Sequence, residues 1–215
     1  MSQEITNPSN RHLEAAAAKG DSDAQFLWGR ALLYGKGVKR NIQTAIQWIT
    51  KAARRGNTPA QCLLGYCYDT GLGVSQDSVQ AVYYYKKAAS RGHRSGQFNL
   101  ALCYREGIGV RRNPKQAVHW YRKAAAKGDD EAQCDLGWCY AEGFGVKQDY
   151  AKARFWFRRA ASRGNPKALF NLGLSHLEGR GVPRNTMKAT RFFHQAARRG
   201  HTKARRFLMR LSKQH

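Results

Sequence analysis

Acidic residues are scarce in this chain of 215 residues, because 14 Asp and Glu stand against 38 Lys and Arg, for a formal net charge of +24. Long apolar runs are also absent, since nowhere do about eighteen apolar residues follow one another, the length that a membrane-spanning helix needs. Residues 1–14 contain no apolar stretch typical of a signal peptide. We therefore expect neither a transmembrane segment nor secretion by a cleaved signal.

Cysteine is infrequent as well. Five cysteines, an odd number at low density, argue against a disulfide framework and favour a reducing compartment, so we expect a cytoplasmic protein. Cys62 and Cys67 are five residues apart, as are Cys134 and Cys139. On a helix such a pair has Cα atoms about 8–9 Å apart, beyond disulfide reach. Zinc-binding spacings such as C-x-x-C are missing, and we expect buried thiols.

Glycine recurs with a period of 36 residues. It occupies the last position of every repeat, after a segment that reads approximately KAAxxG, and the column consists of Gly20, Gly56, Gly92, Gly128, Gly164 and Gly200. Self-similarity at such a period is the sequence signature of a repeat architecture. The column defines five repeats, at residues 21–56, 57–92, 93–128, 129–164 and 165–200.

Each repeat contains the signals of two helices, which we call helix A (repeat positions 2–13) and helix B (positions 22–34). Alanine at position 25, an aromatic residue at position 28 and an alanine pair at positions 32 and 33 share one face of helix B. Asn or Asp at position 21 is suited to cap the start of helix B, and the last glycine of the repeat is suited to end it. Small residues at positions 4 and 9 of helix A allow neighbouring helices to approach closely.

The clearest copies of the pattern are LGWCYAEGFGV (Leu136–Val146) and QAVHWYRKAAAKG (Gln116–Gly128). This pattern resembles the Sel-one-like repeat (SLR) family, which is related to the tetratricopeptide repeats, over residues 21–200. The resemblance implies an all-α fold, a right-handed α/α superhelix in which the five repeats form a single solenoid over residues 1–215. Helical caps are expected at residues 1–20 and 201–215. His176 departs from the family pattern, which usually has Tyr there, and Ala101 replaces the usual Gly.

The resemblance also implies an adaptor or scaffold without catalytic residues, and the motifs agree. The GxGV loops lack both the preceding strand and the third glycine of a dinucleotide fingerprint, so we interpret them as structural turns. The seven histidines form no H-x-x-x-H or H-E-x-x-H group. We therefore expect a protein that is not an enzyme and that uses no cofactor or metal.

Positions 7 and 10 of helix A lie outside the packing columns, so we expect them to line one face of the array. They combine amides with aromatic and aliphatic side chains, a mixture that suits the binding of an extended peptide. The residues assigned to partner binding are Arg30, Tyr66, Asn99, Asp135, Trp138 and Asn171. In the alternative interpretation, asparagine at position 7 serves packing and position 10 is buried between repeats.

Lys or Arg occupies position 35 in six consecutive copies, counting the segment before the first repeat. This pattern has a structural explanation, because a basic residue near a helix C-terminus gains about 0.3–1 kcal/mol from the helix dipole. The rest of the positive charge is harder to explain in this way, and a regular row of cations attracts polyanions. The residues assigned to polyanion binding are Lys39, Arg40, Arg55, Arg91, Arg111, Arg112, Lys127, Arg163, Arg184 and Arg199.

Two functional hypotheses follow, and neither fixes an oligomeric state. In the first, the protein is a non-enzymatic adaptor that binds a protein or peptide, an acidic one, through the helix A face. In the second, the basic surface binds nucleic acid, chiefly through its phosphates, because nothing in the sequence resembles a base-reading module. Inactivation of a toxin or effector by capping it is a third possibility, which the sequence does not separate from other partner binding.

Overall fold

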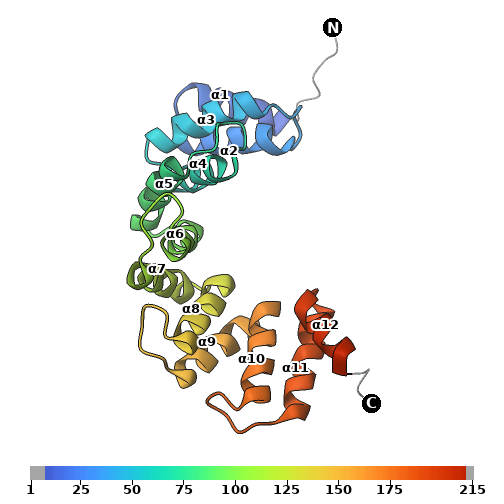
Figure 1. The fold of residues 1–215 in the computed structure, drawn as a ribbon. Coiled ribbons are helices and arrows are strands. Elements are labelled where there is room, and N and C mark those ends of the chain that lie inside the picture. Colours follow the sequence, from blue (N-terminus) through green and yellow to red (C-terminus); the bar gives the residue numbers. More distant parts are fainter. Residues whose placement is uncertain (1–7, 212–215) are drawn as a thin grey trace. The chain divides into compact units, whose positions relative to one another are not determined.

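The computed structural model describes residues 8–211, and the regular structure in that range is entirely α-helical (Figure 1). The helices are α1 (Pro8–Ala18), α2 (Ser22–Tyr34), α3 (Ile42–Arg54), α4 (Thr58–Thr70), α5 (Ser78–Ser90), α6 (Arg94–Glu106), α7 (Pro114–Ala126), α8 (Asp130–Glu142), α9 (Tyr150–Ser162), α10 (Pro166–Glu178), α11 (Thr186–Arg198) and α12 (Thr202–Leu211). The even-numbered helices α2 to α10 are the A helices of the five repeats, and the odd-numbered helices α3 to α11 are the B helices. The predicted all-α repeat of helix pairs is confirmed.

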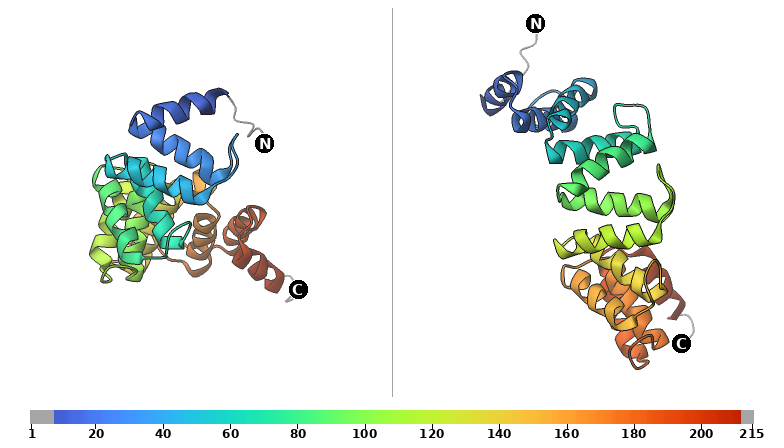
Figure 2. Two further views of the ribbon diagram at one scale, coloured as in Figure 1. Left: turned by 90° about the horizontal axis from the view of Figure 1, so that it is seen from above. Right: turned by 90° about the vertical axis from the view of Figure 1, so that its left-hand side faces the viewer.

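The helices form two compact units, which divide between Arg112 and Asn113. In the first unit, α1 to α5 each pack against the next helix along the chain, and α7 to α11 do the same in the second (Figure 2). The division falls inside the third repeat. Helices α1 and α12 flank the repeats where the caps were predicted, whereas residues 1–7 and 212–215 of those caps lie outside the described residues.

Side-chain caps begin both kinds of helix. Asn41 Oδ1 accepts a hydrogen bond from the Thr44 backbone N–H at 3.0 Å, and position 21 caps the other B helices in the same way. The first residue of each repeat caps helix A, as Asn165 does for the Ala168 N–H, and the sequence analysis overlooked this column. The last glycine of each repeat has a positive φ, for example +89° at Gly56, which glycine adopts without strain. The caps predicted for helix B are confirmed.

Helices A and B pack closely where glycine occupies position 9. A Cβ placed on Gly65 would lie 2.8 Å from Tyr85 Cδ1, and one placed on Gly173 would lie 2.5 Å from Phe193 Cε1. These distances are too short for carbon atoms in contact, so the predicted close approach is confirmed. Position 29 supplies the large buried side chains of the B helices, at most 3% exposed, namely Ile49, Tyr85, Tyr121, Phe157 and Phe193. The aromatic column at position 28 is half-buried beside them.

A column of buried glutamines joins each A helix to the B helix before it. Gln61 Nε2 donates to the Ala53 carbonyl oxygen at 3.1 Å. The glutamines that make this bond, each to the carbonyl eight residues earlier, are Gln25, Gln61, Gln97 and Gln133. Their Oε1 atoms are buried and have no hydrogen-bond partner within the described part of the chain. The fifth repeat has the buried Leu169 at this position, so a repeat folds without the bond.

Candidate functional site

The residues assigned to partner binding in the first unit are accessible to solvent. Arg30 is exposed on α2, and its guanidinium carbon lies 5.4 Å from the ring centre of Phe26. Tyr66, at the same repeat position on α4, is 45% exposed. Asn99 on α6 is half-buried. Position 10 is therefore not buried in α2 and α4, contrary to the alternative interpretation.

In the second unit the assigned residues Asp135, Trp138 and Asn171 are all half-buried. Asn171 Nδ2 on α10 lies 3.8 Å from Cys134 Sγ on α8, a weak hydrogen bond between consecutive A helices. The Trp138 ring packs against Phe144, with ring centres 5.4 Å apart. Asn171 thus has the packing role that the alternative interpretation gave to asparagine at position 7.

Consecutive A helices lie side by side within each unit. Asn57, which caps α4, donates from Nδ2 to Asp23 Oδ1 on α2 at 2.6 Å. Lys167 Nζ on α10 lies 2.7 Å from Glu131 Oε2 on α8. Positions 7 and 10 are three residues apart and share one face of their helix. Each unit therefore presents these positions of neighbouring repeats on one surface, the A-helix face.

Arginines at position 35 bond to the repeat before their own. Arg163 Nη1 donates to the Gly128 carbonyl oxygen at 2.9 Å. The bonds of this kind are Arg55 to Gly20, Arg91 to Gly56, and Arg163 to Gly128. A carbonyl at the end of a B helix has no partner within that helix, so each arginine satisfies an acceptor of the preceding repeat. The guanidinium groups stay exposed and keep further N–H donors for an anion.

Position 20, in the loop after helix A, has a comparable structural role. Arg40 Nε donates to the Leu33 carbonyl and Arg112 Nε to the Arg105 carbonyl, both at 3.1 Å. In the fourth repeat Gln148 makes the equivalent bond at 2.7 Å. Because a neutral glutamine replaces arginine here, the position requires a hydrogen-bond donor rather than a positive charge.

The other residues assigned to polyanion binding are exposed, with Lys39, Arg111 and Arg184 in the loops between helices A and B, and Lys127 and Arg199 at the ends of B helices. The B helices add a feature that the sequence analysis missed. Lys87 Nζ lies 4.5 Å from the ring centre of Tyr83, and Lys123 Nζ lies 4.8 Å from that of Trp120. Cations therefore lie beside aromatic rings on these two helices.

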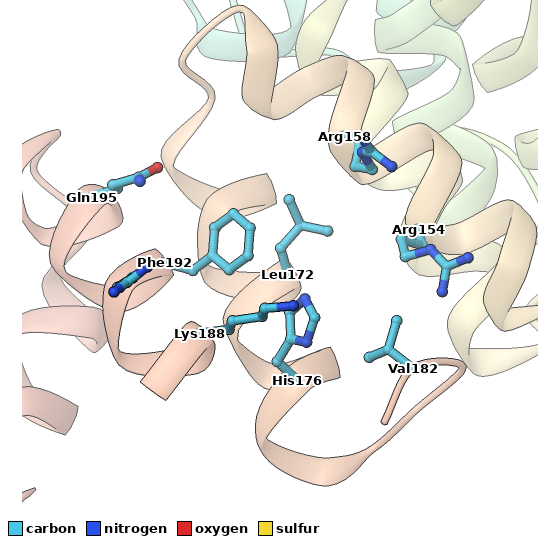
Figure 3. Close-up of a pocket in the computed structure, with 9 residues that line it drawn as sticks. Arg154, Arg158, Leu172, His176, Val182, Lys188, Phe192 and Gln195 are labelled. Atoms are coloured by element: carbon cyan, nitrogen blue, oxygen red, sulfur yellow. The ribbon is translucent and has the colours of Figure 1, made fainter. Parts of the chain in front are cut away.

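The second unit contains a pocket of about 540 Å³ that the sequence analysis did not anticipate (Figure 3). Its floor is α10, which contributes Leu172 and His176, and α9 and α11 form its sides. Figure 3 shows Arg154 and Arg158 of α9 across the pocket from Phe192 of α11. The signal in the sequence was the departure of His176 from its column, where three of the other repeats have tyrosine.

The thiols offer no reactive site, since all five cysteines are buried and none forms a disulfide. Burial raises the pKa of Cys62 and Cys103 to about 12 and that of Cys67 to about 11. The prediction of buried thiols is confirmed. Within residues 8–211, no group of three or more His, Cys, Asp or Glu side chains is placed to hold a metal ion, and no helix is long and apolar enough to span a membrane.

The packed helix pairs with a 36-residue period define a helical repeat solenoid. The family model described as Sel1 repeat matches the chain five times, at residues 22–57, 58–93, 94–129, 130–165 and 166–201. The chain belongs to the Sel1 repeat family. Proteins built from Sel1 repeats generally mediate protein–protein interactions, and the scaffold is typically non-catalytic.

Solved structures agree with this assignment. A protective antigen of uropathogenic Escherichia coli with an SLR fold is 37% identical, with a TM-score of 0.87, over 92% of this chain and 42% of its own. A Sel1 repeat protein from Oxalobacter formigenes is 33% identical, with a TM-score of 0.84. The match covers 91% of this chain and 80% of that protein. An immunity protein from Pseudomonas aeruginosa shares the fold, with 23% identity and a TM-score of 0.54. That match covers 93% of this chain and 69% of the immunity protein. No curated protein matches the chain.

Proposed function

We propose that the protein is a non-enzymatic adaptor that binds a protein or peptide partner through its A-helix face. The observation that carries the proposal is the exposure of large apolar side chains on consecutive A helices of the first unit. Leu27 on α2 is 44% exposed and Tyr66 on α4 is 45% exposed. Apolar side chains gathered on one surface favour burial against a partner, and Arg30 adds a cation beside them.

The partner in this proposal is acidic. The net charge of +24 gives the protein a positive field that speeds encounter with acidic chains and disfavours basic ones. Each unit has a half-buried polar side chain on its own A-helix face that suits the backbone of an extended segment, Asn99 in the first unit and Asp135 in the second. Five buried thiols support a reducing environment, so the proposal places the adaptor in the cytoplasm.

The test compares two tyrosines of matched exposure on different helices. Tyr66 on α4 is 45% exposed and Tyr83 on α5 is 46% exposed. Partners captured from a lysate by the wild-type chain are identified, and their affinities for Tyr66→Ala and Tyr83→Ala are measured. We expect Tyr66→Ala to weaken binding about tenfold or more, as for an interface anchor, and Tyr83→Ala to leave it unchanged. The reverse order would reject the A-helix face as the binding surface.

A second candidate function is the binding of nucleic acid to the B helices and loops. It is supported by the pairing of cations with aromatic rings on α5 and α7, since such surfaces combine phosphate contacts with base stacking. The loop residues Lys39 and Arg111 are its best phosphate contacts, because Arg40 and Arg112 beside them already bond to backbone carbonyls.

Fluorescence anisotropy with a labelled single strand and a labelled duplex tests this second candidate. For the duplex, log K should fall with log salt with a slope of about −0.9 per neutralised phosphate. Arg111→Glu should then lower the affinity more than Arg55→Glu does. Because Arg55→Glu also removes the hydrogen bond to Gly20, the helicity of that variant is checked. Binding that is absent at about 50 mM salt would reject this function and leave the adaptor.

A further inference from the structure

The pocket in the second unit is lined by four cations and by no acidic side chain. Arg154 and Arg158 come from α9, and Lys188 and Arg191 come from α11. Neither helix contains a single Asp or Glu. Arg154 donates to the carbonyl oxygen of Gly181, in the loop that borders the pocket. The site therefore concentrates positive charge in a concave space, where a bound anion exchanges water for fixed donors.

The equivalent place one repeat earlier in the same unit is already filled. Tyr140 stands there at repeat position 12 and is 9% exposed. Its hydroxyl accepts a hydrogen bond from Arg122 Nη2 at 2.9 Å, and Lys152 Nζ lies 5.7 Å from its ring centre. Val118, 1% exposed, occupies the position that is Arg154 in the next repeat. A phenol thus completes the earlier junction, and no ligand is needed there.

At the pocket, His176 and Arg158 take the places of Tyr140 and Arg122. The imidazole stacks on Phe192, with ring centres 5.7 Å apart and planes inclined by 11°. It brings no hydroxyl, so Arg158 lacks the acceptor that Tyr140 gives to Arg122. His176 Nδ1 is buried and has no hydrogen-bond partner among the described residues, a condition that native proteins rarely leave unresolved. The junction therefore lacks a group that is polar and negatively charged.

We propose that this pocket binds a phosphate monoester carried on an aromatic or other planar apolar group. The anionic oxygens match the guanidinium forks of Arg154 and Arg158, and a phosphate monoester near its second pKa also carries an O–H proton for His176 Nδ1. Phe192 and Leu172 supply apolar surface for the attached group. A volume of about 540 Å³ suits a small-molecule ligand or one modified side chain. The site lies between B helices and goes beyond the proposed A-helix interface.

Isothermal titration calorimetry of the full chain at about 150 mM salt tests the ligand class. Phenyl phosphate should bind, phenol should not, and inorganic phosphate should bind about tenfold more weakly because it forgoes the apolar contact, worth about 1–2 kcal/mol. Equal binding of phenol and phenyl phosphate would overturn the proposal. Two further probes distinguish the sources of the phosphate: tighter binding of adenosine monophosphate assigns a nucleotide, and tighter binding of a phosphotyrosine peptide assigns a modified protein.

Three variants localise the binding. His176→Tyr copies the filled junction at Tyr140, and Arg158→Ala removes a phosphate donor; each should weaken phenyl phosphate binding about tenfold or more. Arg122→Ala removes the same charge one repeat earlier and should change the affinity by less than about twofold. Circular dichroism checks that all three remain folded. Equal losses in Arg158→Ala and Arg122→Ala would show general attraction to a basic surface, and unchanged affinity in His176→Tyr would reject the pocket.

Discussion

Arg91 donates a hydrogen bond from its guanidinium to the carbonyl oxygen of Gly56, 35 residues earlier in the chain. Gly56 has a φ of +89°, and a Cβ at that residue would lie 2.5 Å from Arg91 Nη1. One glycine therefore ends helix α3 and also leaves space for a side chain from the following repeat. Loss of the glycine would disturb both functions at once.

Gly56→Ala should destabilise the protein more than Gly200→Ala. Both glycines have a φ of +89°, so each alanine has a conformational cost of about 1–2 kcal/mol. Only Gly56 faces an arginine, whereas a Cβ on Gly200 would meet nothing within 4 Å among the described residues. In urea unfolding, we expect Gly56→Ala to lower the free energy of unfolding by about 1 kcal/mol more than Gly200→Ala does, which is the contribution of one hydrogen bond. Equal losses would show that the arginine bond contributes nothing to stability.

Gln133→Leu should change the free energy of unfolding by less than about 1 kcal/mol. The lost hydrogen bond to Ala125, 3.0 Å long, contributes about 0.5–1.5 kcal/mol. Removal of the unpartnered Oε1 atom offsets that loss, and the fifth repeat already has Leu169 at this position. Gln133→Ala, which leaves a cavity, should cost more. A leucine variant that unfolds as easily as the alanine variant would contradict this balance.

The five thiols should not react with a disulfide-exchange reagent at about pH 8 while the protein is folded. Burial raises the pKa of Cys62 to about 12 and that of Cys67 to about 11, so these two have almost no reactive thiolate at that pH. All five cysteines are buried, which keeps the reagent from their sulfur atoms. Absorbance of the released chromophore measures the reaction, and denaturant should release all five equivalents. Rapid modification of the folded chain would contradict the buried arrangement.

Acidification should loosen the start of helix α12. His201 Nδ1 accepts a hydrogen bond from the Ala204 N–H at 3.1 Å, and a protonated ring cannot accept it. Burial, followed by the charges of Lys203 and Lys167, lowers the pKa of His201 below its usual value of 6.5. As the pH falls, the unfolded segment therefore takes up the proton before the folded one does. The stability that the His201 cap gives to the start of α12 is fully present above about pH 6.5 and is lost as the pH falls through the lower, folded-state pKa.

Amide hydrogen exchange at Ala204 measures this effect between about pH 7 and pH 5, after correction for intrinsic exchange. His201→Asn is the matched variant, because Asn165 caps α10 through its side-chain oxygen at 3.0 Å. Protection of Ala204 should fall with pH in the wild-type chain and stay constant in the variant. The same pH dependence in both chains would show that the cap does not titrate through His201.

The fold was predictable because its signals recur five times. A single glycine, alanine or asparagine does not identify a helix or its end, but the same residue every 36 positions does. The bounds of the helices follow from the capping residues. The buried glutamines escaped notice although they recur, because a polar residue in a helix is usually exposed. Only the structure shows that Gln61 lies beneath the preceding helix.

The candidate site was predictable only in part. Position 10 was predicted to line the A-helix face, and Tyr66 there is exposed, whereas Trp138 at the same position is half-buried. The bond from Arg163 to Gly128 joins residues 35 apart and depends on how repeats stack. The pocket depends on residues that break the repeat, His176 and Arg154, and a search for recurring patterns gives little weight to single departures. The role of His176 and Arg154 is recognised only by comparison with Tyr140 and Val118, which occupy the same positions one repeat earlier and fill the equivalent space.

The bond between Arg91 and Gly56 also bears on the order in which the repeats are completed during synthesis. A nascent chain emerges from the ribosome N-terminus first, so α3 is synthesised before the arginine that satisfies its last carbonyl. The helix ends that such a bond completes lie at Gly20, Gly56 and Gly128, and each stays incomplete until about one further repeat has left the exit tunnel and folded against it. At these three places the next repeat supplies the bond that completes the preceding helix end, so a chain that stalls before that arginine is synthesised leaves the glycine carbonyl without this partner.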